Sequence, residues 1–259
     1  LCCCPSTHLM FKNNTEYVSC VAGETKDCSK CDYGENLSEW RVYFSGLFMS
    51  VKKIIVPSEF VAETIFNYYD NVKDKTYVRP HLNFKEREFS ALENELSNKR
   101  KIRLAYLGYR AHNKGWKTWE KIYNSLYLRQ YYDLYHIGSN DHYSYNVKSV
   151  PYSFANGGIM SAVNALEKNG IDIVILWSIV PESYSYTLFE SVAAGIPVIT
   201  KTMSGNIYET VRSNGESIGV ICNDDKKLFE FLSNIDEVKK VIDYPRKKYT
   251  LSFNSDENL

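Results

Sequence analysis

The chain has 259 residues, of which 44% are hydrophobic, so it can bury a sizeable core as one large domain or two small ones. Lysine plus arginine total 31 and aspartate plus glutamate total 31, which gives a net charge of zero. This balance argues against a dedicated nucleic-acid-binding protein, because such proteins carry an excess of basic residues.

No apolar run is long enough to predict a membrane span. The longest uninterrupted run covers residues 173–177, whereas a transmembrane helix needs about 20 apolar residues. The sequence shows no charged segment followed by an apolar stretch, and it therefore predicts no secretory signal. The chain begins with leucine, and we therefore expect it to be a piece of a longer protein.

The first part of the chain combines cysteines with two short apolar elements. An apolar stretch at 51–56 is followed by Pro57 and Ser58, which open a helical run that reaches Tyr69. A charged segment without a strand pattern then extends from 83 to 103. We therefore predict a partial amino-terminal domain (1–82), a linker (83–102) and a carboxy-terminal domain (103–259).

After this linker, apolar strands alternate with helical patterns. The predicted strands are 104–107, 134–137, 171–177 and 197–200. The predicted helices cover about 116–126, 159–166, 187–194 and 228–235. The strand at 171–177 is apolar on both faces, which is typical of a buried parallel sheet. The alternation predicts a doubly wound, Rossmann-like α/β domain.

In such a sheet, ligands bind beyond the carboxyl ends of the strands. Lys114 follows the first predicted strand, where the next helix begins. A lysine beside the free amides of a helix start can bind a phosphate or diphosphate. The alternative interpretation is a solvated lysine at the start of a helix.

Two glutamates follow the strongest strand. Glu182 lies in the loop and Glu190 lies in the next helix, with seven residues between them. Carboxylates there can accept hydrogen bonds from sugar hydroxyls, while the amides of residues 186–188 can hold phosphates. The alternative is that Glu182 only complements the helix dipole and that Glu190 lies on the surface.

These motifs together resemble the nucleotide-sugar-binding half of retaining GT-B glycosyltransferases of the group 1 (family four) type. That half carries a Lys-Gly after its first strand, then Glu-x7-Glu followed by Ala-Gly-x-Pro-Val. The matching segments are Lys114-Gly115, Glu182 to Glu190, and residues 194–198, with further similarity at 56–58, 78–81 and 205–211. The resemblance covers about residues 40 to 240 and implies a GT-B fold.

The resemblance also implies roles for individual residues. Glu182 would be the catalytic residue that contacts the donor sugar, and Glu190 would hold the ribose hydroxyls. The donor diphosphate would be bound by Lys114, Gly115, Tyr186, Thr187 and Leu188. The nucleobase contacts are expected from the segment 138–152.

One position departs from the family pattern. The family has Gly-Arg five residues before the lysine, and this sequence has Gly108-Tyr109 there, with Arg110 one place later. Arg110 is therefore a weaker candidate for the diphosphate site. Ser185 stands where the family often has glycine, a small change that need not block the amides.

The implied activity is transfer of a sugar from a nucleotide-sugar co-substrate to a glycan or lipid-linked acceptor, as in polysaccharide biosynthesis, with retention at the anomeric carbon. Such enzymes need no metal-binding Asp-x-Asp, and the sequence contains none. We expect a cytoplasmic location or the cytoplasmic face of a membrane, and cooperation with the remainder of the amino-terminal domain. Two alternatives are an inactive nucleotide-binding module and a zinc-stabilised interaction domain.

The cysteines suggest a separate feature. Cys4, Cys20, Cys28 and Cys31 include one Cys-x-x-Cys pair, and four thiolates satisfy tetrahedral zinc. The alternatives are reduced buried thiols or a disulfide in an oxidising compartment.

Overall fold

The computed structural model describes residues 10–13, 16–19, 37–88, 100–138 and 144–254. Its strands are β1 (Met10–Asn13), β2 (Glu16–Ser19), β3 (Ile54–Val56), β4 (Thr76–Val78), β5 (Leu82–Arg87), β6 (Ile102–Leu107), β7 (Tyr132–Gly138), β8 (Lys148–Pro151), β9 (Ile173–Leu176), β10 (Val198–Lys201), β11 (Gly219–Cys222) and β12 (Lys248–Phe253). Its α-helices are α1 (Leu37–Ser50), α2 (Glu59–Phe66), α3 (Trp116–Asn124), α4 (Leu128–Tyr131), α5 (Phe154–Gly157), α6 (Ser161–Lys168), α7 (Tyr186–Ala193), α8 (Asn206–Asn214), α9 (Asp225–Ser233) and α10 (Ile235–Asp243).

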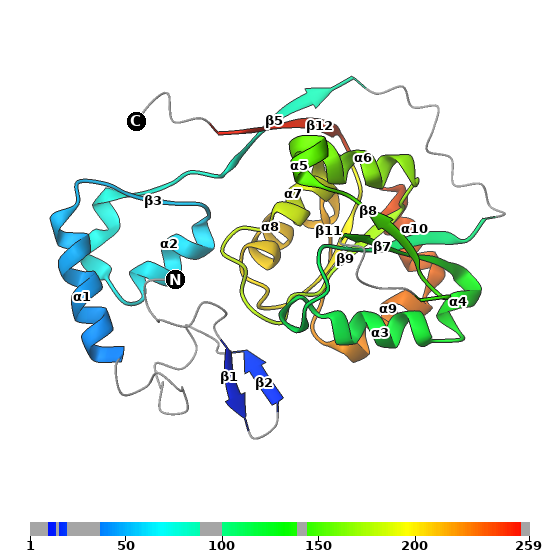
Figure 1. Cartoon of the computed structure of the whole chain (residues 1–259), viewed down its shortest axis with the longest axis horizontal. Coiled ribbons are helices and arrows are strands. Elements are labelled where there is room, and N and C mark those ends of the chain that lie inside the picture. The colour runs from blue at the N-terminus through cyan, green and yellow to red at the C-terminus, as the bar shows by residue number, and fades with distance from the viewer. Residues whose placement is uncertain (1–9, 14–15, 20–36, 89–99, 139–143, 255–259) are drawn as a thin grey trace.

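A six-stranded parallel sheet forms the larger part of the molecule (Figure 1). Its strand order is β11-β10-β9-β6-β7-β8, and every neighbouring pair is parallel. The chain builds one side of the sheet from β6 to β8, then returns to the centre and builds the other side from β9 to β11. This is the order of a doubly wound sheet, whose direction of winding reverses between β6 and β9. The predicted fold class is confirmed.

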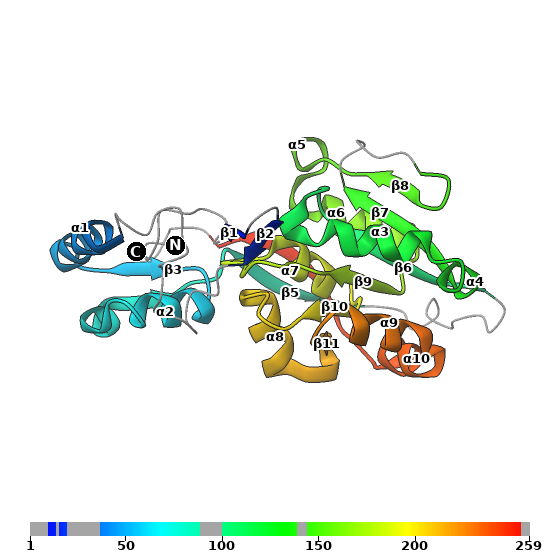
Figure 2. The ribbon, with the colours of Figure 1, turned by 90° about the horizontal axis from the view of Figure 1, so that it is seen from below.

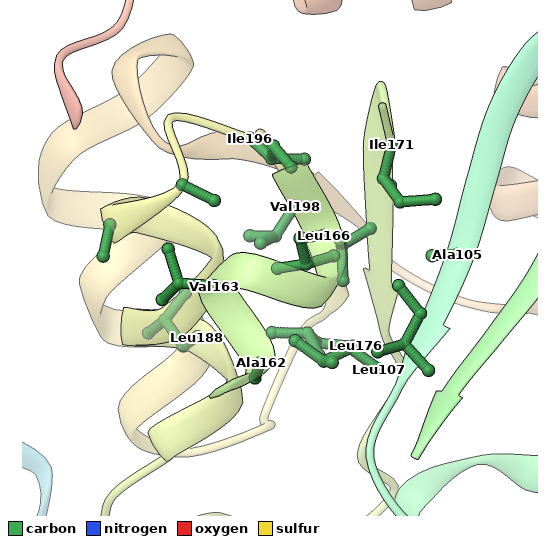
Figure 3. Close-up of a cluster of buried hydrophobic side chains, with 14 of the residues drawn as sticks. Ala105, Leu107, Ala162, Val163, Leu166, Ile171, Leu176, Leu188, Ile196 and Val198 are labelled. Carbon is green, nitrogen blue, oxygen red and sulfur yellow. The ribbon is translucent and has the colours of Figure 1, made fainter. Parts of the chain in front are cut away.

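Both faces of this sheet are covered by helices. Along β6, Leu104 and Tyr106 belong to the cluster with α3, α9 and α10, whereas Ala105 and Leu107 belong to the cluster with α6, α7 and α8. Figure 3 shows part of this second cluster, which includes Leu107 of β6, Leu166 of α6 and Leu188 of α7. Alternate side chains of one strand are thus buried on opposite faces, which explains why the parallel strands are apolar throughout.

A smaller unit contains α1, β3, α2 and β4 and lies at one end of the molecule (Figure 2). Strands β3 and β4 pair in parallel. Phe48 of α1, Val56 of β3 and Ile65 of α2 share its own buried cluster. The apolar stretch at 51–56 and the helix after Pro57 were both predicted, and both are confirmed.

The predicted linker is partly wrong as a description of structure. Its first residues belong to β5, which pairs antiparallel with β12 near the carboxyl end of the chain. Each of the two strands has a single buried residue, Leu82 in β5 and Leu251 in β12, and its other residues are exposed or half-buried. Neither strand therefore has the continuous apolar pattern of the parallel strands. Residues 89–99 lie outside the described part of the chain, and the domain boundary stays a prediction.

None of the helices in the described ranges is long and apolar enough to cross a membrane.

Candidate functional site

The candidate site lies where the winding of the sheet reverses. Strands β6 and β9 are neighbours, and the segments that follow them lead to α3 and to α7 on opposite faces. Doubly wound proteins bind ligands at the carboxyl end of the sheet, where the segments after two adjacent parallel strands diverge in this way. Lys114 comes from the first of these segments and Glu182 from the second.

The segment that carries Lys114 is fixed against the end of β9. His112–Lys114 is a short 3-10 helix, and Gly115 follows it with a φ of 81°. A Cβ atom on Gly115 would lie 2.0 Å from the carbonyl oxygen of Trp177. The carbonyl of Asn113 accepts a 2.9 Å hydrogen bond from the amide of Ile179. Glycine is therefore required after Lys114 both by its backbone conformation and by this close approach.

Lys114 and Glu182 form an ion pair between the two segments. The ammonium of Lys114 lies 2.6 Å from Oε1 of Glu182, and the side chains are 30% and 13% exposed. The hydroxyl of Ser178 donates a 2.8 Å hydrogen bond to the same carboxylate oxygen. Both predicted residues thus meet in one site, although 68 positions separate them in the sequence. Ser178 was missed, and the only signal for it was a polar residue directly after a buried strand.

The backbone of Glu182 is held by the turn between β10 and α8. Its amide donates to the carbonyl of Ser204 at 3.1 Å, and its carbonyl accepts from the amide of Asn206 at 2.8 Å. A Cβ atom on Gly205 would lie 2.5 Å from the amide nitrogen and carbonyl oxygen of Glu182. Because residue 205 is a glycine, the β10–α8 turn can contact the loop that carries Glu182 and hold the backbone of Glu182 in position.

Helix α7 begins beside these loops. Ser185 caps it by accepting a 3.3 Å hydrogen bond from the amide of Leu188. The amide of Leu188 is therefore already occupied, and its side chain is fully buried, so it does not present the donor that was predicted. Tyr186 and Thr187 lie in the first turn, where amides have no acceptor within the helix.

Glu190 lies one turn further into α7 and is only 8% exposed. This burial excludes the alternative that it is a surface residue. Its Oε2 atom is buried without a hydrogen-bond partner in the described part of the chain. Burial raises the pKa of this carboxyl to about 7, because an ionised carboxylate is poorly solvated there. Burial and the charge of Glu190 together raise the pKa of Tyr152 to about 12, so the two side chains are close.

A hollow lies beyond the ends of β7 and β8, on the side of α5 and α6. It is lined by Gly138, Pro151, Tyr152, Ser153, Asn156, Gly157, Ser161, Asn164 and Ala165. Tyr152 connects this hollow with Glu190. The segment expected to contact a nucleobase, 138–152, contributes its first residue and its last two, while residues 139–143 lie outside the described part.

No family model matches the sequence, and no curated protein is similar to it. Solved structures do match. Anabaena HepE in complex with UDP-glucose aligns with a TM-score of 0.54 at 14% identity, over 79% of this chain and 59% of HepE. A glycosyltransferase from Rickettsia africae ESF-5 aligns with a TM-score of 0.53 at 17% identity, over 79% of this chain and 60% of that one.

A third match is WaaG, a glycosyltransferase involved in lipopolysaccharide biosynthesis. It has a TM-score of 0.52 at 12% identity, and the match covers 86% of this chain and 65% of WaaG. The chain has the GT-B glycosyltransferase fold. It spans about three fifths of the length of HepE and of the Rickettsia protein.

Within this GT-B fold, the guanidinium of Arg110 lies over the ring of Trp116, with its central carbon 5.5 Å from the ring centroid, and the side chain is exposed. The residue before it, Tyr109, lies near Lys114, because the ammonium of Lys114 is 5.8 Å from the centroid of its ring.

The predicted zinc ligands of this GT-B chain, Cys4, Cys20, Cys28 and Cys31, lie outside the described residues. Within the described ranges, no group of three or more histidine, cysteine or acidic side chains could hold a metal ion. Cys222, which was expected to be a core thiol, is buried and free.

Proposed function

We propose that this protein transfers a sugar from a nucleotide-sugar donor to a glycan or lipid-linked acceptor, with retention of the anomeric configuration. The observation that carries the proposal is the ion pair of Lys114 and Glu182, which lies where the direction of winding of the sheet reverses, between β6 and β9. A GT-B structure similar to this chain holds UDP-glucose, which makes a uridine diphosphate sugar the first donor to test.

Each part of the donor can be assigned to particular residues of the site. Lys114 and the amides of Tyr186 and Thr187 would bind the diphosphate, since a cation and unpaired helix amides both attract phosphate oxygens. The buried carboxylate of Glu190 would accept hydrogen bonds from the ribose hydroxyls. The hollow beside Tyr152 would hold the nucleobase, with Glu190 linking it to the phosphate end of the site.

The reaction breaks the bond between the anomeric carbon and the β-phosphate oxygen, whose electron pair leaves with the nucleoside diphosphate. An acceptor hydroxyl forms the new bond on the same face, and its proton leaves with the diphosphate. Lys114 and the start of α7 would neutralise the charge that develops on the leaving group. Glu182, which ion-pairs with Lys114 in this structure, would then face the donor sugar.

The acceptor is proposed at the level of chemical class. Among the structures similar to this chain, WaaG is involved in lipopolysaccharide biosynthesis and WaaB is a lipopolysaccharide outer core galactosyltransferase. Their names favour a lipid-linked saccharide as acceptor for this protein. We accordingly propose that it acts in the cytoplasm or at the cytoplasmic face of a membrane.

Release of nucleoside diphosphate from a panel of nucleotide sugars tests this function. The wild-type chain should cleave one donor, and Glu182→Gln should lower kcat at least tenfold. Glu167→Gln is the matched control, because Glu167 also forms an ion pair, with Arg87 at 2.8 Å, but is not among the residues proposed to bind the donor. Binding of a nucleoside diphosphate without cleavage of any donor would contradict the proposed transfer and identify an inactive nucleotide-binding module.

A further inference from the structure

The loop that carries Glu182 is held from a second side, by the smaller amino-terminal unit. The hydroxyl of Ser58 donates a 2.7 Å hydrogen bond to the carbonyl of Ser183, across 125 positions of sequence. Ser58 itself is 6% exposed, whereas Ser183 is exposed, so the donor side of this hydrogen bond is buried. Ser183 directly follows Glu182, and the contact therefore reaches the residue next to the proposed catalytic carboxylate.

A second contact attaches the next residue of the loop to the segment that follows the smaller unit. The hydroxyl of Tyr184 accepts a 3.2 Å hydrogen bond from the amide of Leu82, and the ring of His81 lies 4.6 Å from the ring of Tyr184. Three consecutive residues, 182 to 184, are thus attached to different parts of the structure. The β10–α8 turn holds the first, α2 holds the second, and the crossing segment at 81–82 holds the third.

Ser58 also caps α2, so its hydroxyl has two tasks. The oxygen accepts from the amide of Val61 at 3.4 Å, while the hydrogen is directed to Ser183. Capping alone would be satisfied by an acceptor such as aspartate. The carbonyl of Ser183 is an acceptor and requires a donor. Of the two hydrogen bonds of Ser58, the one to Ser183 therefore uses the hydroxyl proton.

We propose that Ser58 is a positioning residue of the transfer site: its hydroxyl fixes the Glu182 loop to the amino-terminal unit. This inference rests on the proposed function for its catalytic consequence, but the mechanical link can be tested without it. Loss of the hydroxyl should free the loop on one side and leave the donor-binding residues in place.

Hydrogen–deuterium exchange of the full chain measures the link directly. The amide of Glu182 donates to Ser204, so its exchange reports whether the loop stays in place. Ser58→Ala and Ser58→Gly should accelerate exchange over 182–186 about 3- to 10-fold, the range expected for one lost hydrogen bond. Glycine is included because it replaces a capping residue with only a small loss of helix stability. Ser58→Thr keeps the hydroxyl and should match the wild type.

Asp224→Ala is the matched control for loss of a cap. Asp224 caps α9 by accepting from the amide of Lys227 at 2.8 Å, and it lies outside the proposed site. This variant should leave exchange over 182–186 unchanged. Unchanged exchange in both Ser58→Ala and Ser58→Gly, or equal acceleration in Asp224→Ala, would overturn the proposal.

Steady-state kinetics distinguish a role of Ser58 in positioning the Glu182 loop from a role in binding the donor. With the cleaved donor, Ser58→Ala and Ser58→Gly should lower kcat about 3- to 10-fold and change KM less than twofold. An unchanged kcat together with faster exchange would overturn the catalytic role of the link. If the wild-type chain binds no nucleoside diphosphate, the proposed function fails, whereas the exchange result still decides whether Ser58 holds the loop.

Discussion

At the residue scale, Glu190 is the least expected feature of the molecule. A carboxyl group that is 8% exposed and has an unpartnered buried oxygen is unfavourable when ionised. Proteins retain such groups mainly where a ligand completes their hydrogen bonds. The resemblance to glycosyltransferases suggested a ribose-binding role for Glu190, but a single sequence could not show that the side chain is buried without a partner.

The raised pKa of Glu190 has a consequence for stability. Since the pKa is about 7 in the folded chain and 4.5 is its ordinary value, the folded state binds more protons between these limits. The free energy of unfolding should therefore fall as pH rises from about 4.5 to about 7. Glu190→Gln should remove this dependence and be more stable than the wild type at pH 8 by about 1–3 kcal/mol.

Thermal or urea unfolding between pH 5 and pH 8 measures this effect. Glu167→Gln serves as control, because it removes a carboxylate that has an arginine partner and should not stabilise the chain at pH 8. A Glu190→Gln variant that is less stable than the wild type at pH 8 would contradict the assignment of an unpartnered, destabilising carboxylate.

At the element scale, the site depends on a turn that approaches another loop closely. Gly205 and Gly215 have similar backbones, with φ of 67° and 58°, but only the Cβ position of Gly205 is blocked, by the backbone of Glu182. Alanine at either position should cost about 1–3 kcal/mol in backbone strain. Gly205→Ala should cost at least about 1 kcal/mol more, because the loops must separate. Equal losses in urea unfolding would contradict the close approach.

Whether a strand or helix could be predicted from the sequence depends on how its side chains are buried. Strands β6, β7, β9 and β10 were predicted because burial on both faces makes them apolar throughout. Strands β5 and β12 were missed, since their pairing joins segments far apart in sequence and most of their residues are exposed. Helix α1 was missed because it carries no clear polar stripe, and Val42, Tyr43 and Met49 are exposed on it.

In the site, too, some features could be predicted from the sequence and others could not. Lys114, Glu182 and Glu190 could be found from sequence because each follows a recognisable strand or helix start. Their geometry could not, because the ion pair of Lys114 and the occupied amide of Leu188 depend on how separate loops pack. Ser178 was missed for the same reason, and Tyr152 was expected only as the last residue of the segment 138–152.

At the scale of the whole molecule, β12 ties the end of the chain to the segment that connects the two units. It pairs with β5 from Leu82↔Phe253 to Arg87↔Lys248, and Leu251 is 3% exposed against the larger core. Leu251→Ala should lower the free energy of unfolding by about 2–4 kcal/mol. Phe253→Ala, at a side chain that is 51% exposed, should cost less than about 1 kcal/mol. Similar losses in chemical denaturation would contradict the packing of this strand.

The proposed sugar transfer requires a donor diphosphate site at Lys114. Calorimetric titration of the chain with UDP-glucose, and then with other nucleotide sugars, tests it most directly. Lys121→Ala is the matched control, because Lys121 also forms an ion pair, with Asp225 at 2.9 Å, on the exposed side of α3. We predict that Lys114→Ala weakens binding at least tenfold, about 1.4 kcal/mol, while Lys121→Ala binds like the wild type. Equal affinity of the Lys114→Ala variant and the wild type, or no binding of any nucleotide sugar, would contradict the account.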